Sequence, residues 1–213
     1  EFVAGRPGYE SQGPENGSIA AAFGGTTTIV DFAMAHAPDM PMDEIQRRVE
    51  RFKGQCYVDF AFHCGLLGPV TFQAMDQIRE VIENGVPSFK VFTTFSRRKP
   101  PHMLDAGRLL NVMTEVAKHS GIMAVHAEDD EIVEFMIEKL LREGREHYKY
   151  VHLAHNNISE DVSFQKVIRL GKHTGAAIYF VHVTAKEGVD AILQARSQRQ
   201  AVYGEVLHNF LCF

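Results

Sequence analysis

The sequence predicts an α/β fold in which short strands alternate with helices along a parallel sheet, and two observations support this. Six short runs rich in β-branched and aromatic residues alternate with segments whose apolar residues recur at helical spacing. No two of these strands are joined by the two-residue turn of a β-hairpin. This pattern is typical of βα units, whose sheet is either closed as a barrel or open and doubly wound.

The expected elements follow one another in a regular order. A loop over residues 1–16 and a short helix over 18–23 precede the first strand. The expected strands span residues 26–32, 56–63, 88–92, 122–126, 176–182 and 201–205. Helices are expected over residues 43–53, 71–83, 104–119, 130–144, 159–172 and 187–197. A polar stretch over 146–157 has no periodicity and is expected to be a loop, with a lid as one interpretation.

Composition excludes several classes of protein. The chain has 213 residues, 45% of them hydrophobic, and a formal charge of −5 without a basic block, which argues against nucleic acid as a partner and favours a small substrate. Its three cysteines lack the spacing of a disulfide framework or a zinc knuckle, and this favours a reducing cytoplasm. No apolar run approaches the roughly 18 residues of a membrane span. Since no methionine begins the chain, we expect an internal segment of a longer protein.

One lysine stands in a run of residues otherwise suited to burial. Lys90 is the central residue of Ser88-Phe89-Lys90-Val91-Phe92, which is expected to be a strand. Burying an ammonium group without a partner is costly, so this lysine is paired, neutral at working pH, or chemically modified. The alternative is a side chain that reaches out to solvent at the end of the strand.

Two histidines occupy corresponding positions in later strands. His126 closes the strand over 122–126 and His182 closes the strand over 176–182. In a β/α barrel the carboxyl ends of the strands form the catalytic face, so three nitrogen-bearing side chains are expected to converge there. Neutral imidazole is a preferred zinc ligand, and zinc lowers the pKa of bound water to about 7. Lys90 can join such a site only after losing its proton and, most usefully, after reacting with carbon dioxide to a carbamate that bridges two cations.

Several motifs together resemble the dihydropyrimidinase and hydantoinase branch of the amidohydrolase superfamily. The resemblance covers essentially the whole chain, in order and at plausible spacing. The matching segments are Gly25-Thr26-Thr27-Thr28-Ile29-Val30-Asp31-Phe32, Ser88-Phe89-Lys90-Val91-Phe92, Val125-His126-Ala127-Glu128, Val181-His182-Val183 and Gly204-Glu205. The resemblance implies a TIM-like (β/α)8 barrel whose two zinc ions and bridging hydroxide hydrolyse the cyclic amide bond of dihydropyrimidines or hydantoins.

The resemblance also implies roles for individual residues. Lys90 matches the catalytic carboxylated lysine that bridges both zinc ions, and His126 and His182 match the histidines of the second metal. Residues 1–213 then form one incomplete barrel domain with about strands two to seven. The family's His-x-His pair is expected before Glu1 and its aspartate, the general base, beyond Phe213, so we expect the isolated chain to be inactive. A homotetramer, a small cyclic amide or ureide substrate, and no nucleic acid or membrane partner are implied as well.

Two positions depart from the family pattern. Phe95 stands where the family usually has a tyrosine that donates a hydrogen bond to the substrate and the developing oxyanion. Loss of one such donor typically costs about 100-fold or more in rate. The substitute is expected to be Thr93, Thr94 or a backbone amide, or else the substrate class differs. Residues 153–156, Leu-Ala-His-Asn, replace the family's Ser-Arg-Pro.

Other interpretations stay open. A lysine in a barrel strand is also how Schiff-base aldolases work, and the same superfamily includes non-catalytic scaffold proteins without metal ligands. Retention of Lys90 with both histidines argues against a scaffold. Among the other histidines, His63 is expected to end a strand as a core residue, and His155 to be a solvated loop residue. Glu128 either supports His126 or favours the start of the next helix.

Overall fold

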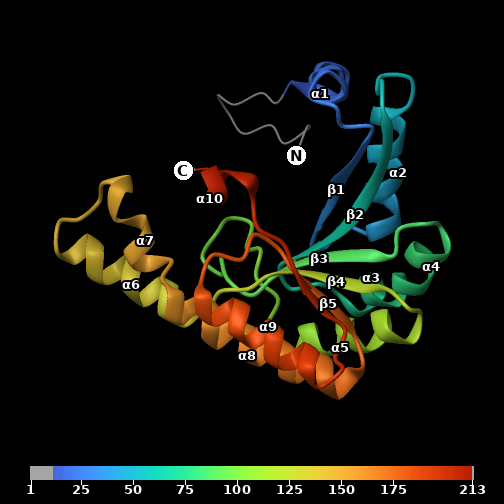
Figure 1. The fold of residues 1–213 in the computed structure, drawn as a ribbon. Coiled ribbons are helices and arrows are strands. Elements are labelled where there is room, and N and C mark those ends of the chain that lie inside the picture. The colour runs from blue at the N-terminus through green and yellow to red at the C-terminus, as the bar shows by residue number, and fades with distance from the viewer. Residues whose placement is uncertain (1–11, 213) are drawn as a thin grey trace.

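Six parallel strands form one sheet in the computed structural model, which describes residues 12–212 (Figure 1). Each strand pairs with the strand that follows it in the sequence, in the order β1-β2-β3-β4-β5-β6. The strands are β1 (Thr28–His36), β2 (Asp59–Leu67), β3 (Ser88–Phe92), β4 (Ile122–His126), β5 (Ala177–Phe180) and β6 (Val202–Gly204). The parallel βα arrangement predicted from the sequence is therefore confirmed, while residues 1–11 of the expected N-terminal loop lie outside the described part.

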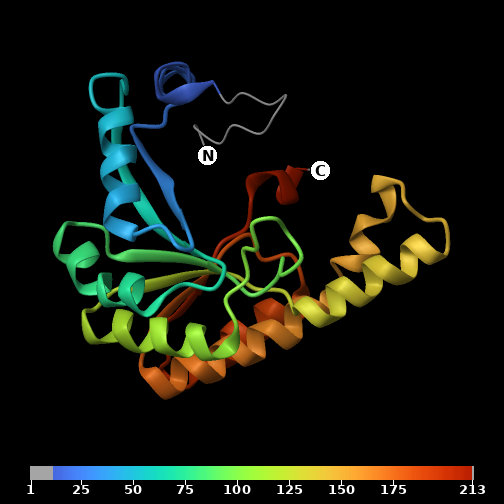
Figure 2. The same ribbon diagram turned by 180° about the vertical axis from the view of Figure 1, so that it is seen from behind.

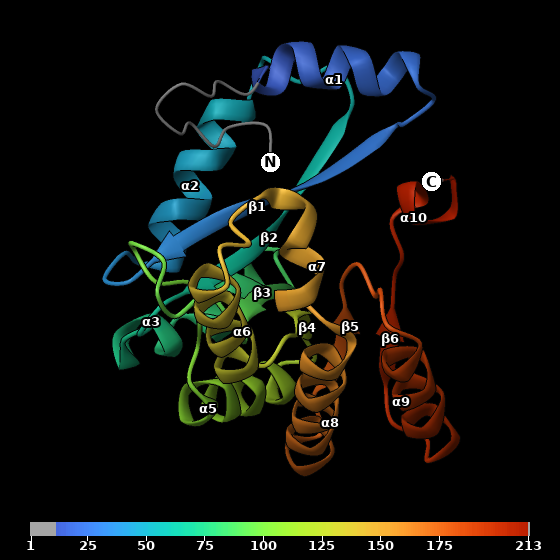
Figure 3. The same ribbon diagram turned by 90° about the vertical axis from the view of Figure 1, so that its left-hand side faces the viewer.

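Helices α2 (Pro41–Phe52), α3 (Phe72–Asp76), α4 (Ile78–Glu83), α5 (Ala106–Lys118), α8 (Asn157–Thr174) and α9 (Lys186–Ser197) connect the strands and lie along one side of the sheet (Figures 1 and 3). The other described helices are α1 (Gly13–Phe23), α6 (Asp130–Arg142), α7 (Val151–Ala154) and α10 (His208–Cys212), with a 3-10 turn, η1 (Tyr148–Tyr150). Helices α6 and α7 project away from the rest (Figure 2). Among the described helices, none combines the length and the apolar character needed to cross a bilayer.

The register of the strands separates two faces of the sheet. Gly65, Lys90, Ala124 and Tyr179 are partners across β2, β3, β4 and β5, so they share one face. Their sequence neighbours point to the opposite face, where the helices pack. The helix-covered face is apolar and buried, whereas the free face carries the polar side chains of the strands. The sheet therefore places Lys90 on the face that the helices leave open.

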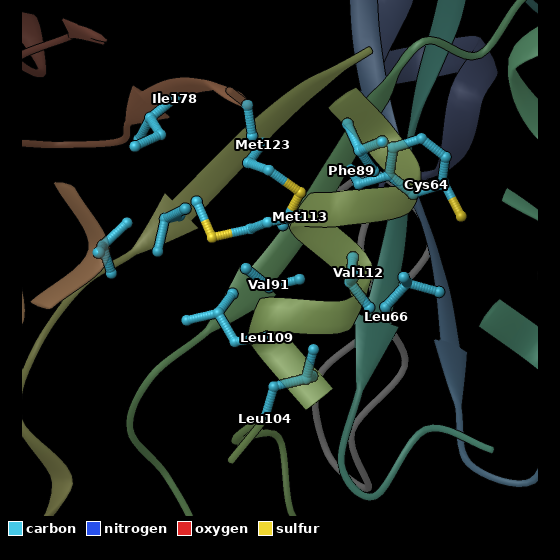
Figure 4. Packing of buried hydrophobic residues seen from close by; sticks show 14 of the residues in the cluster. Cys64, Leu66, Phe89, Val91, Leu104, Leu109, Val112, Met113, Met123 and Ile178 are labelled. Carbon is cyan, nitrogen blue, oxygen red and sulfur yellow. The ribbon is translucent and has the colours of Figure 1, made fainter. Parts of the chain in front are cut away.

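The hydrophobic core lies between the sheet and the helices packed on it, and Figure 4 shows the part formed with helix α5. Leu109, Val112 and Met113 of α5 face Val91 of β3 and Met123 of β4, and all five are buried. Burial of each such side chain stabilises the fold by about 1.5–3 kcal/mol. Helix α5 begins where the Asp105 side chain accepts a hydrogen bond from the Arg108 backbone amide. These contacts fix β3 and β4, the strands that carry Lys90 and His126.

The observed elements differ from the predicted ones in several places. Strand β1 runs on to His36 instead of ending at residue 32. The stretch over 146–157, expected to be a loop, contains η1 and α7. Helix α1 begins at Gly13 because Pro14, expected in a loop, occupies its first turn, where proline is favourable. The predicted helix over 71–83 is two helices that meet at Gln77, whose side-chain oxygen accepts a hydrogen bond from the Met42 amide at 3.2 Å. Strand β2 runs on to Leu67, so His63 lies inside the strand and the prediction that it ends the strand is wrong.

Gly121→Ala is expected to destabilise the fold by about 1–3 kcal/mol because a methyl group there has no room. An added Cβ would lie 2.8 Å from the Pro87 carbonyl oxygen and 2.9 Å from Val116 Cγ1. The same oxygen accepts the Ile122 amide at the start of β4, so it cannot yield. Urea unfolding measures the loss. Gly24→Ala is the control, since its Cβ would meet only ordinary contacts at 3.4 Å, and an equal loss in both variants would contradict the packing argument.

Candidate active site

Lys90 lies on the face of the sheet opposite the helices, and its side chain is nevertheless buried. Only 4% of the residue is exposed, and its Nζ lies 4.4 Å from the centre of the Phe92 ring. Burial lowers the pKa of the Lys90 amine to about 7, although the negative charge of Glu205 acts to raise it. The neutral amine is therefore far more populated near pH 7 than it is for a lysine exposed to water. The alternative in which the Lys90 side chain reaches out to solvent is therefore wrong. The neutral amine is also the form of lysine that reacts with carbon dioxide.

His126 and His182 face one another at the ends of adjacent strands. His126 is the last residue of β4 and the register partner of Phe92, while His182 lies two residues beyond the end of β5. Nδ1 of His126 and Nε2 of His182 are 3.0 Å apart. His182 has φ of +43°, a left-handed conformation that is unusual for a residue with a side chain. By strand alternation His182 would point away from Tyr179, so this backbone turn is what directs its ring toward His126.

The two imidazoles fit one shared metal ion. Two zinc–nitrogen bonds of about 2.0–2.1 Å in a tetrahedral site hold their nitrogens roughly 3.3 Å apart, close to the observed spacing. Burial lowers the pKa of His126, and burial with the charge of His126 lowers the pKa of His182 to about 4. Both rings are therefore neutral at pH 7, as metal binding requires. Among residues 12–212, no three His, Cys, Asp or Glu side chains lie close enough together to hold a metal ion.

Glu128 links His126 to a third histidine. Its carboxylate lies 2.6 Å from Nε2 of His126 and 2.7 Å from Nδ1 of His155. Burial opposes its ionisation, but these two hydrogen bonds lower the pKa of Glu128 to about 2. The carboxylate also raises the pKa of His155. Because the Nε2 proton of His126 is donated to Glu128, the lone pair of Nδ1 points toward His182. Carboxylates commonly orient metal-binding histidines in this way.

His155 is the residue that sequence reasoning misplaces. The sequence predicts a solvated loop residue, but His155 follows α7 and contacts Glu128 across 27 positions of the chain. Nothing in the local sequence signals this contact, because the segment has no periodicity and the partner lies on another element. The only sequence signal is the position itself, at the replaced Ser-Arg-Pro segment.

Two phenylalanines form an aromatic wall beside the histidines. The Phe95 and Phe92 rings lie 5.0 and 5.2 Å from the His126 ring, measured between centroids. Phe95 has φ of +71°, and the Arg98 guanidinium lies 3.9 Å from its ring centre. Phe95, the predicted substrate-binding residue, is thus brought to the same place as His126. Its ring offers no hydrogen-bond donor.

The two threonines expected to replace the missing donor are bound elsewhere. Thr93 and Thr94 are 4% and 0% exposed. The Thr93 hydroxyl donates to the Glu128 carbonyl at 2.8 Å and accepts the Glu128 amide at 3.0 Å. The Thr94 hydroxyl donates to Asp130 at 3.3 Å. Both hydroxyls therefore hold the strand-end loops together, and these bonds disfavour either one as the substitute donor.

The interior of the open face carries further polar pairs. Nδ1 of His63 lies 2.6 Å from the Ser88 hydroxyl, and the Tyr179 hydroxyl donates to Glu205 at 2.7 Å. Burial lowers the pKa of His63, and burial with the Glu205 hydrogen bond raises the pKa of Tyr179 to about 12. These pairs satisfy their own polar atoms within the sheet. His63 is therefore a satisfied interior residue, in agreement with the sequence analysis.

Comparison with known proteins points to one family. A D-hydantoinase of Streptomyces coelicolor is 30% identical over 205 residues, which are 95% of this chain and 43% of that protein. An allantoinase of Bacillus licheniformis is 29% identical over 209 residues, 96% of this chain and 45% of the relative. The solved dihydropyrimidinase of Brevibacillus agri superposes with a TM-score of 0.88 at 27% identity, over 93% of this chain and 42% of that one. No profile of a known protein family matches the chain.

The chain belongs to the hydantoinase and dihydropyrimidinase family. It spans less than half the length of these relatives. A solved D-hydantoinase superposes with a TM-score of 0.89 at 26% identity over 94% of the chain and 43% of that structure. The predicted fold, part of an amidohydrolase-type β/α barrel, is therefore confirmed. The hydantoinase family assignment made from the motifs is confirmed as well.

Proposed function

We propose that this chain carries part of the active site of a zinc-dependent enzyme that hydrolyses the cyclic amide bond of dihydropyrimidines or hydantoins. The observation that carries this proposal is the convergence of His126 and His182, 3.0 Å apart, with the buried Lys90 close enough for its charge to act on both rings. Relatives named D-hydantoinase, allantoinase and dihydropyrimidinase support the substrate class, a small cyclic amide or ureide.

The proposed ligand roles follow from the chemistry of the three side chains. His126 and His182 would hold one zinc ion through Nδ1 and Nε2. Lys90, as a carbamate, would bridge this ion and a second one, and the lowered pKa of its amine favours that modification. Zinc held in this way supplies an activated water and polarises the ring carbonyl of the substrate.

The residues around the ligands position and shield them. Glu128 holds the Nε2 proton of His126 and so keeps Nδ1 free for a metal. Phe92 and Phe95 exclude water beside His126 and offer an apolar surface to a substrate ring. Water exclusion strengthens the electrostatic interactions of the site.

Zinc content and ring opening test the proposal in the protein that contains this chain. We expect two zinc ions for each chain and hydrolysis of dihydrouracil, a hydantoin or allantoin, with loss of both on chelation. Borohydride reduction with a carbonyl substrate should leave no adduct on Lys90. Absence of stoichiometric zinc would favour a scaffold, and a reduced adduct would favour a Schiff-base enzyme.

Phe95→Tyr is expected to raise kcat by up to about 100-fold on a substrate whose developing oxyanion the new hydroxyl reaches. The family's donor is restored at a position whose ring lies 5.0 Å from the His126 ring. Steady-state kinetics on the three substrates above measure the gain. Phe92→Tyr is the matched control on the other ring, and a loss of activity with every substrate in Phe95→Tyr would show that the phenyl ring is itself required.

We also propose a reducing compartment and a homotetramer for the protein that contains this chain. Cys56, Cys64 and Cys212 are all free thiols. Burial raises the pKa of the Cys64 thiol to about 12, so it is unreactive. The tetramer is proposed from the family resemblance, and residues 1–213 are proposed to be one partial catalytic domain.

A further inference from the structure

The turn between β5 and α9 fixes the direction of the His182 ring. His182 stands in this turn with φ of +43° and places Nε2 3.0 Å from Nδ1 of His126. A left-handed backbone at a residue with a side chain costs about 1–3 kcal/mol and persists only where the surroundings hold it. The residues after His182 must therefore be restrained.

One buried carboxylate supplies this restraint. Glu160, in the first turn of α8, is 8% exposed. Its Oε1 accepts hydrogen bonds from the backbone amides of Thr184 at 3.1 Å and Ala185 at 3.0 Å, and its Oε2 accepts one from the Thr184 hydroxyl. On the other side of the turn, the Val183 amide donates to the Glu205 carbonyl at 2.8 Å. Glu160 and the Glu205 carbonyl, just after β6, thus hold the two sides of the turn that follows His182.

The neighbouring helix leaves space for this carboxylate. A Cβ at Gly188, in the first turn of α9, would lie 2.8 Å from Oε1 of Glu160. Glu160 therefore approaches the N-terminus of α9, where a negative charge is favourable. Ser163, one turn further along α8, places its hydroxyl 2.8 Å from that of Thr93, which holds the Glu128 loop. The same buried face of α8 thus contacts the turn that carries His182 and Thr93, the residue that binds the loop after His126.

We infer that Glu160 is a positioning residue that holds the His182 ring against His126. It acts through Thr184 and Ala185 and touches neither substrate nor metal. Without its acceptor oxygens, the turn relaxes from the left-handed conformation and the two imidazoles separate. The consequence for metal affinity rests on the proposed function, whereas the pairing of the two rings does not.

Glu160→Gln in the metal-free 213-residue chain tests the pairing directly. The glutamine keeps the size of the side chain but removes the negative charge and one of the two acceptor oxygens that the Thr184 and Ala185 donors use. NMR of the imidazole nitrogens should show His126 and His182 no longer paired, and exchange of the Thr184 and Ala185 amides should become at least about 10-fold faster. Asp161→Asn, on the next residue of α8, should change neither signal. Ile45→Val, in the distant core of α2, separates this effect from a general loss of stability.

Gly188→Ala provides a second variant if Glu160→Gln does not fold. Its methyl group would lie 2.8 Å from Oε1 of Glu160 and so displaces the carboxylate. The imidazole signals and the amide exchange rates should change in the same direction as in Glu160→Gln. Unchanged imidazole signals and unchanged amide exchange in the folded variant would overturn the inference.

Cobalt binding adds a separate readout in the protein that contains this chain. We expect Glu160→Gln to weaken Co²⁺ affinity by about 10- to 100-fold and to change its visible absorption spectrum, with Asp161→Asn unaffected. Failure of the parent protein to bind cobalt would count against the proposed function, while the NMR result alone would still decide the role of Glu160.

Discussion

Lys90→Ala is expected to abolish the binding of two zinc ions and to reduce hydrolysis by about 10³-fold or more in the protein that contains this chain. Alanine cannot form the carbamate that bridges the metals, and His126 with His182 alone offers only two nitrogens. Metal analysis and the rate of ring opening measure both losses. Isotope-labelled bicarbonate should give a carbamate signal in the parent protein that Lys90→Ala lacks.

Two controls make this result specific to the bridging role. Lys118→Ala removes an exposed lysine near the end of α5 and should change neither zinc content nor rate. Acetate added to Lys90→Ala can enter the space that the lysine leaves and should restore part of the activity. Near-normal zinc content in Lys90→Ala would refute the bridging role even if the activity were lost.

The strands that carry the site are predictable because their sequence pattern is local. Strands β3 and β4 have the bounds predicted for them, since turn residues flank each short apolar run. Strand β2 extends past its predicted end at His63, because the open face of the sheet accommodates this polar side chain beside Ser88. The predicted helix over 71–83 divides at Gln77, where the side chain accepts a hydrogen bond from Met42 of α2, a contact that no local pattern contains.

The candidate site shows the same limit. Lys90 stands out in the sequence as a cation inside an apolar strand, and His126 and His182 stand out at the predicted ends of two later strands. The structure pairs the two histidines, although His182 lies two residues beyond β5 and does not close it. The left-handed turn at His182 is not predictable, because glycine rather than histidine is the usual signal for it. His155 and Glu160 act through partners on other elements, so periodicity and spacing do not reveal them.

The burial of Lys90 has a cost that the fold carries. Its amine has a pKa of about 7 in the folded chain, mainly because of burial, against an ordinary value of 10.5 for a lysine exposed to water in the unfolded chain. This difference corresponds to a penalty on the order of 5 kcal/mol for the protonated form. The Phe92 ring, 4.4 Å from Nζ, offsets only about 1–2 kcal/mol by cation–π attraction. Because Lys90 destabilises the fold, its presence is better explained by the chemistry of its amine than by a contribution to stability.

Lys90→Met is therefore expected to stabilise the metal-free chain, and the gain should depend on pH. Below about pH 7 the amine is protonated in both states, so the full penalty acts and the gain is on the order of 5 kcal/mol. Between pH 7 and 10.5 the unfolded chain keeps a proton that the folded chain has released, and the penalty falls to about 1 kcal/mol at pH 9.5. Urea unfolding in buffer free of carbon dioxide at pH 6 and pH 9.5 measures this difference. Lys118→Met is the control and should change the free energy of unfolding by the same small amount at both pH values. An equal gain in stability at pH 6 and pH 9.5 in Lys90→Met would mean that Lys90 is not held as a buried amine.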